Sequence, residues 1–205
     1  MRVFLLALFL AAGAAAQSES ISRPTTGVDE PPRRGTFVES SLGAFTTFGG
    51  SARVARAQPY LSMTVGRELG ERASVFASLG IGASSASCFS ASKSNGDCAA
   101  ADSFGATFVE AGASYGIGVA LRTLLSLKML GGFTDLSPGP VTKNNGVPDH
   151  LPGFHLGGGL ALDYDTHLDH FAVGLDAVVR HTIAKGDATL GLTSLAVMPR
   201  IRYVF

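Results

Sequence analysis

The stretch LSMTVGRELGERASVFASLGIGAS, residues 61–84, decides the predicted fold. It contains two runs in which apolar residues alternate with polar or small ones, and only Arg67 and Phe76 interrupt this alternation. A period of two residues is the pattern of a β-strand with one apolar face. Residues 70–72, Gly-Glu-Arg, separate the two runs and are typical of a tight turn. We therefore predict two antiparallel strands joined as a hairpin.

The same alternation continues on both sides of this hairpin, from Thr36 to Phe205, and predicts eight strands in total. After the hairpin, the apolar rows lie within Thr107–Tyr115, Val119–Met129, Phe154–Tyr164, Phe171–Val179 and Leu195–Phe205. The first strand, Phe37–Phe48, leaves open which of its faces is apolar. Even numbers of alternating segments of about ten residues are typical of outer-membrane barrels.

The predicted connections between the strands also alternate in length. The longer ones are Gly49–Ala57, Ser85–Ala101, Thr134–His150 and Ile183–Thr189. The tight ones are Gly70–Arg72, Gly116–Gly118 and Asp165–Leu168. Long loops on the outside and short turns on the periplasmic side are the arrangement found in outer-membrane barrels.

The polar rows indicate what the apolar rows face. In a soluble β-sandwich the polar face meets water and is rich in Lys and Glu, whereas here it consists mostly of Gly, Ser and Thr with isolated charges. Isolated charges of both signs suit a narrow interior in which each buried charge has a partner. We predict an all-β, eight-stranded, antiparallel up-and-down transmembrane β-barrel over residues 36–205. A soluble β-sandwich is the alternative.

The predicted interior charge network consists of Glu68, Glu110, Arg122, Lys128, Asp176, Arg180 and Arg200, and three further charges share the same rows, Glu39, Asp163 and Arg202. We expect Glu110 to pair with Lys128 or Arg122, because the predicted turn at 116–118 places their strands side by side. An eight-stranded barrel is just wide enough for side chains to fill. We therefore expect no general diffusion pore.

Composition excludes several other classes of protein. The 205 residues include 16 Lys and Arg and 16 Asp and Glu, so the chain lacks the basic surplus of a protein that binds nucleic acid. Hydrophobic residues make up 46% and charged residues 16%, the opposite of a disordered chain. The 26 glycines disfavour a helical protein, since an interior Gly destabilises a helix by roughly 1 kcal/mol relative to Ala.

The first residues, MRVFLLALFLAAGAAAQ, have the order of a secretory signal peptide. Arg2 supplies a positive charge, residues 3–13 form an apolar run too short to span a membrane, and three alanines precede Gln17. We predict a signal peptide over residues 1–16 and a flexible periplasmic segment over residues 17–35. The barrel is then expected in the outer membrane of a Gram-negative bacterium, with both termini in the periplasm. An uncleaved N-terminal membrane anchor is the alternative.

Cys88 and Cys98 fall within one long predicted connection. Proteins of the periplasm and cell surface fold in an oxidising environment, so we predict a disulfide bond between these residues, with two free thiols as the alternative. A bond that closes so short a loop would stabilise the fold by roughly 3 kcal/mol in the chain-entropy model. It would constrain a surface loop and does not indicate redox catalysis.

We predict no catalytic residue, metal site or cofactor, and therefore no enzyme. Residues 112–116, Gly-Ala-Ser-Tyr-Gly, match the G-x-S-x-G motif of α/β-hydrolases, but the helix that this motif requires does not follow. Turn chemistry accounts for a group of potential metal ligands, Asp163, Asp165, His167, Asp169 and His170. Residues 181–183, His-Thr-Ile, lack the Ser of the H-x-S pair that outer-membrane lipid A deacylases carry.

The chain ends Ile201-Arg202-Tyr203-Val204-Phe205, with apolar residues at alternate positions behind a terminal Phe. This ending resembles the signal by which bacterial outer-membrane barrels are recognised for insertion. The resemblance implies that Ile201, Tyr203 and Phe205 are read by the barrel insertion machinery. Aromatic residues near predicted strand ends suit two girdles at the lipid–water interfaces, formed by Tyr115, Tyr164, Phe171, Tyr203 and Phe205 at one end and by Phe133 and Phe154 at the other.

Residues 58–89, QPYLSMTVGRELGERASVFASLGIGASSASCF, resemble the small outer-membrane barrels of the myxobacterial adventurous gliding motility apparatus, specifically the gliding motility protein E (contact-stimulated gliding) group. The likeness extends more loosely to residues 99–105 and to 122–128, RTLLSLK. It implies a non-enzymatic scaffold that works with other envelope motility proteins, and no catalytic residues transfer because the family supplies none. A small channel is the alternative function, and an outer-membrane lipid-modifying enzyme is the second alternative.

Overall fold

The computed structural model describes residues 35–49, 53–70, 72–89, 103–120, 122–144, 146–166, 168, 170–187 and 189–205. The predicted signal peptide and residues 17–34 of the predicted periplasmic segment lie outside the described residues, so both stay predictions. No helix within the described residues has the length and apolar character needed to cross a membrane.

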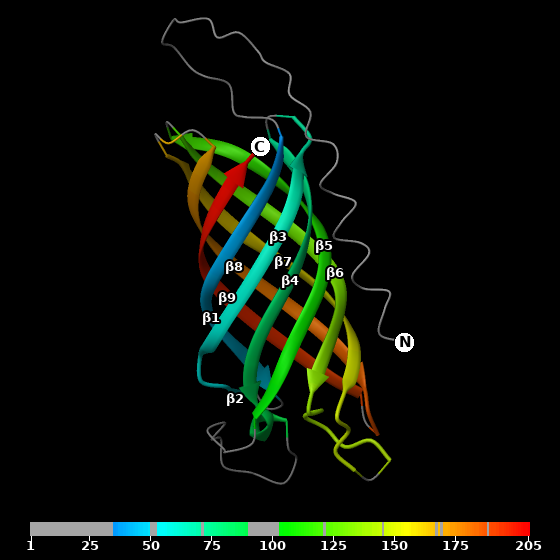
Figure 1. The fold of residues 1–205 in the computed structure, drawn as a ribbon. Helices are drawn as coiled ribbons and strands as arrows, with labels where there is room; N and C mark the ends of the chain where they lie inside the picture. The colour runs from blue at the N-terminus through cyan, green and yellow to red at the C-terminus, as the bar shows by residue number, and fades with distance from the viewer. Residues whose placement is uncertain are drawn as a thin grey trace, which may run out of the picture. The chain divides into compact units, whose positions relative to one another are not determined.

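Eight long strands form the barrel (Figure 1). They are β1 (Thr36–Gly49), β3 (Gln58–Glu68), β4 (Ala73–Ser85), β5 (Ser103–Ala120), β6 (Thr123–Ser137), β7 (Leu151–Asp165), β8 (Phe171–Lys185) and β9 (Thr189–Val204). The short strand β2 (Arg53–Val54) pairs with the end of β1, and a 3-10 helix, η3 (Ala86–Cys88), follows β4. The predicted all-β fold with eight antiparallel strands is confirmed.

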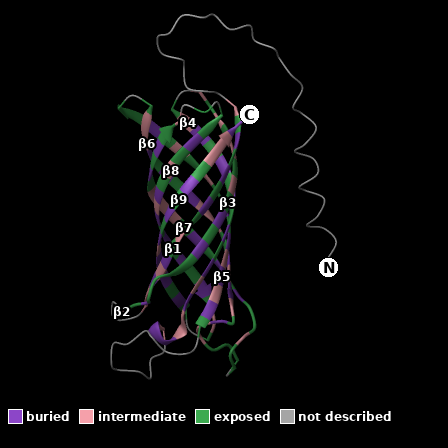
Figure 2. Cartoon of the chain, turned by 60° about the vertical axis from the view of Figure 1, so that its left-hand side comes forward, coloured by how far each residue is buried: buried purple, intermediate pink, exposed green. Residues whose placement is uncertain are grey.

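The strands close into a barrel with a definite stagger. Each long strand is antiparallel to its neighbours, and β1 pairs with both β3 and β9. Following paired residues once around the barrel from Phe37 leads back to β1 at Thr47, a shift of ten residues (47 minus 37). Such a shift requires strands tilted against the barrel axis, as Figure 2 shows. Closure gives the backbone groups of the wall their partners, which a sheet in lipid requires.

Alternation along each strand gives the barrel an apolar outer face and a mixed inner face. Outward side chains such as Leu42, Met129 and Leu156 are exposed by 62%, 69% and 76%. Apolar surface that encircles a closed sheet in this way is stable in lipid and unfavourable in water. The first strand, whose faces the sequence left open, buries Phe37 and Glu39 inside. The fold is therefore that of a transmembrane β-barrel.

The two ends of the barrel carry different connections. The turn rim has the short connections 69–72, 121–122 and 166–170, together with the start of β1 and the end of β9. The loop rim has the connections 50–57, 86–102, 138–150 and 186–188. An even number of strands places both ends of the barrel segment at the same rim, and the amide of Phe205 donates to the carbonyl oxygen of Thr36 at 2.8 Å there.

Three predicted connections are wrong. β6 extends to Ser137, so the connection before β7 covers 138–150 and not Thr134–His150. β5 continues through the predicted turn at 116–118, because Ile117 and Val119 extend the outward apolar row to the end of the strand. The turn falls at 121–122, where Arg122 adopts a left-handed φ of 62°. At the loop rim, β8 and β9 are joined by 186–188 and not by the longer 183–189, since strand alternation also persists there.

Candidate functional site

Arg200 of β9 is the centre of a group of charged side chains in the half of the interior nearer the turn rim. Its Nη1 donates to Glu39 Oε1 at 3.0 Å, and its Nη2 donates to Asp163 Oδ2 at 2.5 Å. Its Nε lies 3.3 Å from Asp176 Oδ1. The carboxylates come from β1, β7 and β8, and all four residues are buried. One guanidinium therefore joins three other strands to β9.

Two further bases and a partly buried acid extend this group. Arg202 Nη2 lies 2.6 Å from Glu39 Oε1, and Arg202 Nη1 lies 3.6 Å from Glu68 Oε1. Lys128 Nζ donates to Asp176 Oδ2 at 2.6 Å and lies 3.9 Å from Glu39 Oε2. We call this set the charged cluster: Glu39, Glu68, Lys128, Asp163, Asp176, Arg200 and Arg202. Acids and bases are interleaved in it, which is the condition for stable burial of charge.

Glu110 and Arg180 form a second ionic contact, the central pair, nearer the middle of the barrel. Arg180 donates from Nε to Glu110 Oε2 at 2.9 Å and from Nη2 to Glu110 Oε1 at 2.8 Å. Ser78 Oγ donates to the same carboxylate at 2.8 Å, and His155 Nε2 lies 3.1 Å from it. Bidentate geometry and additional hydrogen bonds make this one of the stronger kinds of ion pair.

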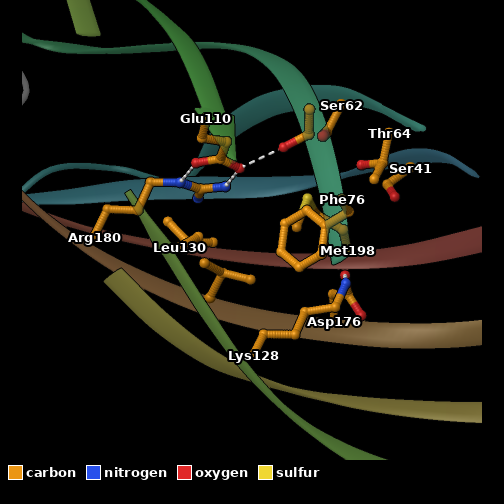
Figure 3. Close-up of a pocket in the computed structure, with 12 residues that line it drawn as sticks. Ser41, Ser62, Thr64, Phe76, Glu110, Lys128, Leu130, Asp176, Arg180 and Met198 are labelled. Atoms are coloured by element: carbon orange, nitrogen blue, oxygen red, sulfur yellow. Dashed lines mark hydrogen bonds and ion pairs between the residues drawn. The ribbon is translucent and has the colours of Figure 1, made fainter. Parts of the chain in front are cut away.

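A cavity of about 20 Å³ lies between the charged cluster and the central pair (Figure 3). Lys128 and Asp176 line it on one side and Glu110 and Arg180 on the other. Such a volume holds about one water molecule, whereas pockets for small ligands measure roughly 300–1,000 Å³. This cavity therefore has no room for a substrate.

Aromatic rings fill the interior nearer the loop rim. The aromatic cluster consists of Phe45, Tyr60, Phe104 and Phe108, each buried. The rings of Phe45 and Tyr60 stack with centroids 5.4 Å apart, and Phe108 meets Phe45 edge-on at 5.9 Å. A Cβ atom at position 80 would overlap the Tyr60 hydroxyl, so Gly80 is what allows this ring to cross the interior. The guanidinium of Arg180 lies 5.1 Å from the Phe108 ring centre and connects the two regions.

Residues beyond the strand ends cover the aromatic cluster at the loop rim. Ala86, Phe89 and Val141 pack against the apolar core of the barrel. Phe89 meets Phe104 edge-on, with ring centroids 5.9 Å apart. Side chains of the described residues thus occupy the interior from one rim to the other.

The structure corrects two predictions about charged residues. Arg122 lies exposed in the turn after β5, so its predicted place inside the barrel is wrong, because β5 is longer than predicted. The predicted pairing of Glu110 with Lys128 or Arg122 is also wrong. In the strand pairing, Lys128 lies opposite Ser114 and not opposite Glu110. Across the interior, Lys128 pairs with Asp176, and Glu110 pairs with Arg180.

The other predicted network residues lie inside. Glu110, Lys128, Asp176, Arg180 and Arg200 are buried, and Glu68 is partly buried at the end of β3. The sequence placed Glu39, Asp163 and Arg202 on the same rows but did not assign them to the network, in which they are direct partners of each other or of Arg200. It also missed His155, Ser78 and the inward aromatic rings. Their positions in the alternating rows of the strands, which place them on the inward face, were the signal that could have identified them.

The remaining predicted site residues lie outside the barrel interior or outside the residues that the structure describes. Cys88 is buried in η3, beyond the end of β4, whereas Cys98 lies outside the described residues, so the disulfide bond stays a prediction. Ile201 and Phe205 are exposed on the outer face, and the Tyr203 ring lies 4.9 Å from that of Phe205. Within the described part of the chain, no three His, Cys, Asp or Glu side chains are placed to hold a metal ion.

Comparisons with known proteins identify the fold but neither a family nor a function. No protein-family model matches the chain, and no curated protein matches it in sequence. Neisserial surface protein A superimposes with a TM-score of 0.60 at 14% identity, over 83% of this chain and 97% of that one. Ail, the attachment invasion locus protein of Yersinia pestis, gives a TM-score of 0.48 at 14% identity, over 83% and 100%. At such identity the likeness shows a shared fold alone, the small eight-stranded barrel of Neisserial surface protein A.

Proposed function

We propose that this chain is an outer-membrane barrel that acts by binding partner proteins, as a scaffold in an envelope-spanning gliding motility machinery. The observation that carries the binding role is the filled interior, in which the charged cluster, the central pair and the aromatic cluster succeed one another along the axis. The cavity between Lys128 and Arg180 measures only about 20 Å³ and is too small for a substrate, so we assign binding to the rims and loops, where barrels and other rigid scaffolds present their functional residues. The motility assignment itself rests on the sequence resemblance of residues 58–89.

The proposal includes export and a defined orientation. We propose that cleavage after residue 16 releases a mature chain beginning at Gln17, with residues 17–35 and both termini in the periplasm. N-terminal sequencing of the membrane-extracted protein tests the cleavage site. Heat-modifiable gel migration of the outer-membrane fraction tests insertion. A periplasmic species without a migration shift would contradict the proposal.

Deletion of the gene tests the motility role directly. Isolated cells on a firm surface should lose single-cell movement, and crosslinked membranes should yield other envelope motility proteins with the tagged barrel. A complemented strain that carries the wild-type chain serves as the control. Normal movement together with the absence of such partners would withdraw the motility assignment and leave the barrel fold unaffected.

Two measurements separate this proposal from its alternatives. Reconstitution in planar bilayers should give little steady conductance, because paired charges and aromatic rings occupy the interior. Stable porin-sized current steps would favour a channel instead. Incubation with lipid A or phospholipid, followed by product analysis, should leave the lipid unchanged, and a released acyl chain would favour an enzyme.

A further inference from the structure

The end of β5 at the turn rim has a strand on one side only. β4 begins at Ala73, which pairs with Tyr115 of β5, while β5 itself continues to Ala120. Over residues 116–120, β5 pairs with β6, and no described strand lies on its other side. In Figure 2 the exposed end of this hairpin stands at the rim beside the label β6. The stagger of the barrel thus leaves a short open sheet edge at this point.

The backbone of this edge is oriented for further pairing. The amide of Gly116 donates to the carbonyl oxygen of Arg72 at 2.6 Å, on the β4 side. Strand alternation turns the N–H of Gly118 to the same side, past the end of β4. A Cβ atom built at position 118 would have no heavy atom within 4 Å, so the space beside it is open. An open edge of this kind is a template for a strand from another chain.

The side chains along the edge also favour a strand. Residues 116–120 read Gly-Ile-Gly-Val-Ala and contain neither charge nor proline, two of the features by which proteins block such an edge. The pairing with β6 shifts register between Gly118 and Ala120, so the regular part of the edge ends at Gly118. Ile117 and Val119 are exposed by 56% and 55% and continue the outward row of β5 beyond Tyr115. β-Branched side chains of this type pack well against a neighbouring strand.

Charge at the two ends of the edge selects the partner. Arg72 lies at its base and Arg122 at its tip, and both residues are exposed. Asp165 lies near the tip, where its amide donates to the Arg122 carbonyl oxygen at 2.9 Å. At the base of the edge, Glu71 precedes Arg72 in the sequence. The exposed Arg67, opposite Val75, adds a second basic residue there, so this end has two basic residues for one acidic residue. A second copy of this chain would bring Arg72 to an equally basic edge. The chain's own residues 17–34 contain three prolines and as many acids as bases.

We propose that residues 116–120 of β5 form a docking site for an extended, acidic segment of a partner protein, which adds to the sheet by backbone hydrogen bonds beside Gly118. Strand addition of this kind takes its affinity from main-chain bonds and its specificity from flanking side chains. The inference rests on the proposed partner-binding role, names the surface that serves it, and is independent of the motility assignment.

Binding of synthetic peptides to the purified barrel in detergent micelles tests the site. The probes are an alternating Val-Glu octapeptide and a Val-Lys octapeptide of the same length. The acidic peptide should bind saturably and at least about tenfold more tightly than the basic one, and it should slow hydrogen exchange at the Gly118 amide. Gly118→Pro removes that amide and should weaken binding about tenfold, the loss expected for one to two hydrogen bonds. Gly118→Ala is the matched control and should bind like the wild type.

A charge reversal keeps the test valid if Gly118→Pro impairs folding. Arg72→Glu leaves the β5 backbone intact and should reverse the preference from the acidic to the basic peptide. Equal binding of both peptides to every variant, or no binding at all, would overturn the proposal. Peptide-free dimerisation that Gly118→Pro abolishes would assign the edge to a second copy instead. Because these readouts require no cells, a failed motility assay does not affect them.

Discussion

The two halves of the barrel interior differ in the side chains that dominate them. Near the turn rim, the charged cluster places carboxylates, two arginines and a lysine around the buried ring of Phe37, whereas near the loop rim the aromatic cluster fills the space with rings. Both halves belong to the same strands and the same inward rows. The comparison separates two kinds of stabilisation within a single fold.

The halves differ in how much each member depends on the others. A ring in the aromatic cluster contributes mainly through the apolar area that it buries, so a smaller apolar residue retains part of that contribution. A charge in the charged cluster is stable only while its partners remain, because a buried charge without a counter-charge is strongly destabilising. Substitutions should therefore have larger effects near the turn rim.

The largest effect is expected at Arg200, which contacts Glu39, Asp163 and Asp176. Arg200→Met should lower the free energy of unfolding by about 3–5 kcal/mol, because three buried carboxylates lose their common counter-charge. Urea titration of the barrel in lipid vesicles measures this. Lys185→Met, at an exposed position, should change stability by about 0.5 kcal/mol or less. Similar values for both variants would remove the distinction between the halves.

The central pair gives the next effect. Glu110→Ala should lower stability by about 3 kcal/mol, since it leaves Arg180 buried without its carboxylate. The double variant Glu110→Leu with Arg180→Met should recover most of this loss, because apolar side chains can replace a buried pair at little cost. A double-mutant cycle should find coupling of Glu110 to Arg180 and far less to Lys128. Stronger coupling of Glu110 to Lys128 than to Arg180 would instead support the Glu110–Lys128 pair predicted from the sequence.

A smaller effect is expected in the aromatic cluster. Phe108→Leu should lower stability by roughly 1–2 kcal/mol, because leucine remains apolar but leaves part of the ring volume empty. The same urea titration measures it, so the value can be compared directly with that of Arg200→Met. A loss for Phe108→Leu that equals or exceeds that of Arg200→Met would show that the two halves do not differ as proposed.

The sequence predicted the barrel well because alternation is local information. Strand number and most of the inward rows follow from a period of two, which every strand except the first, Phe37–Phe48, displays by itself. Partners across the interior do not follow, because they depend on the ten-residue stagger that brings Arg180 opposite Glu110. The end of β5 was also missed. Gly116 and Gly118 suggested a turn, yet both glycines lie within the strand, and the turn follows at residue 122.

The smallest effect on stability is expected at the last residue, outside both halves. Phe205 is exposed by 64%, so Phe205→Ala should change the free energy of unfolding by about 1 kcal/mol or less. If the terminal Phe is read during insertion, the same variant should still reduce the yield of outer-membrane barrel several-fold while secretion continues. Phe154, exposed by 65%, is the matched control, because it is an outward Phe far from the C-terminus. Phe154→Ala should leave the yield unchanged. Equal yields for the two variants would mean that Phe205 acts only as another lipid-facing ring. A loss of yield specific to Phe205→Ala would show that this residue serves assembly, independently of the side chains that stabilise the interior.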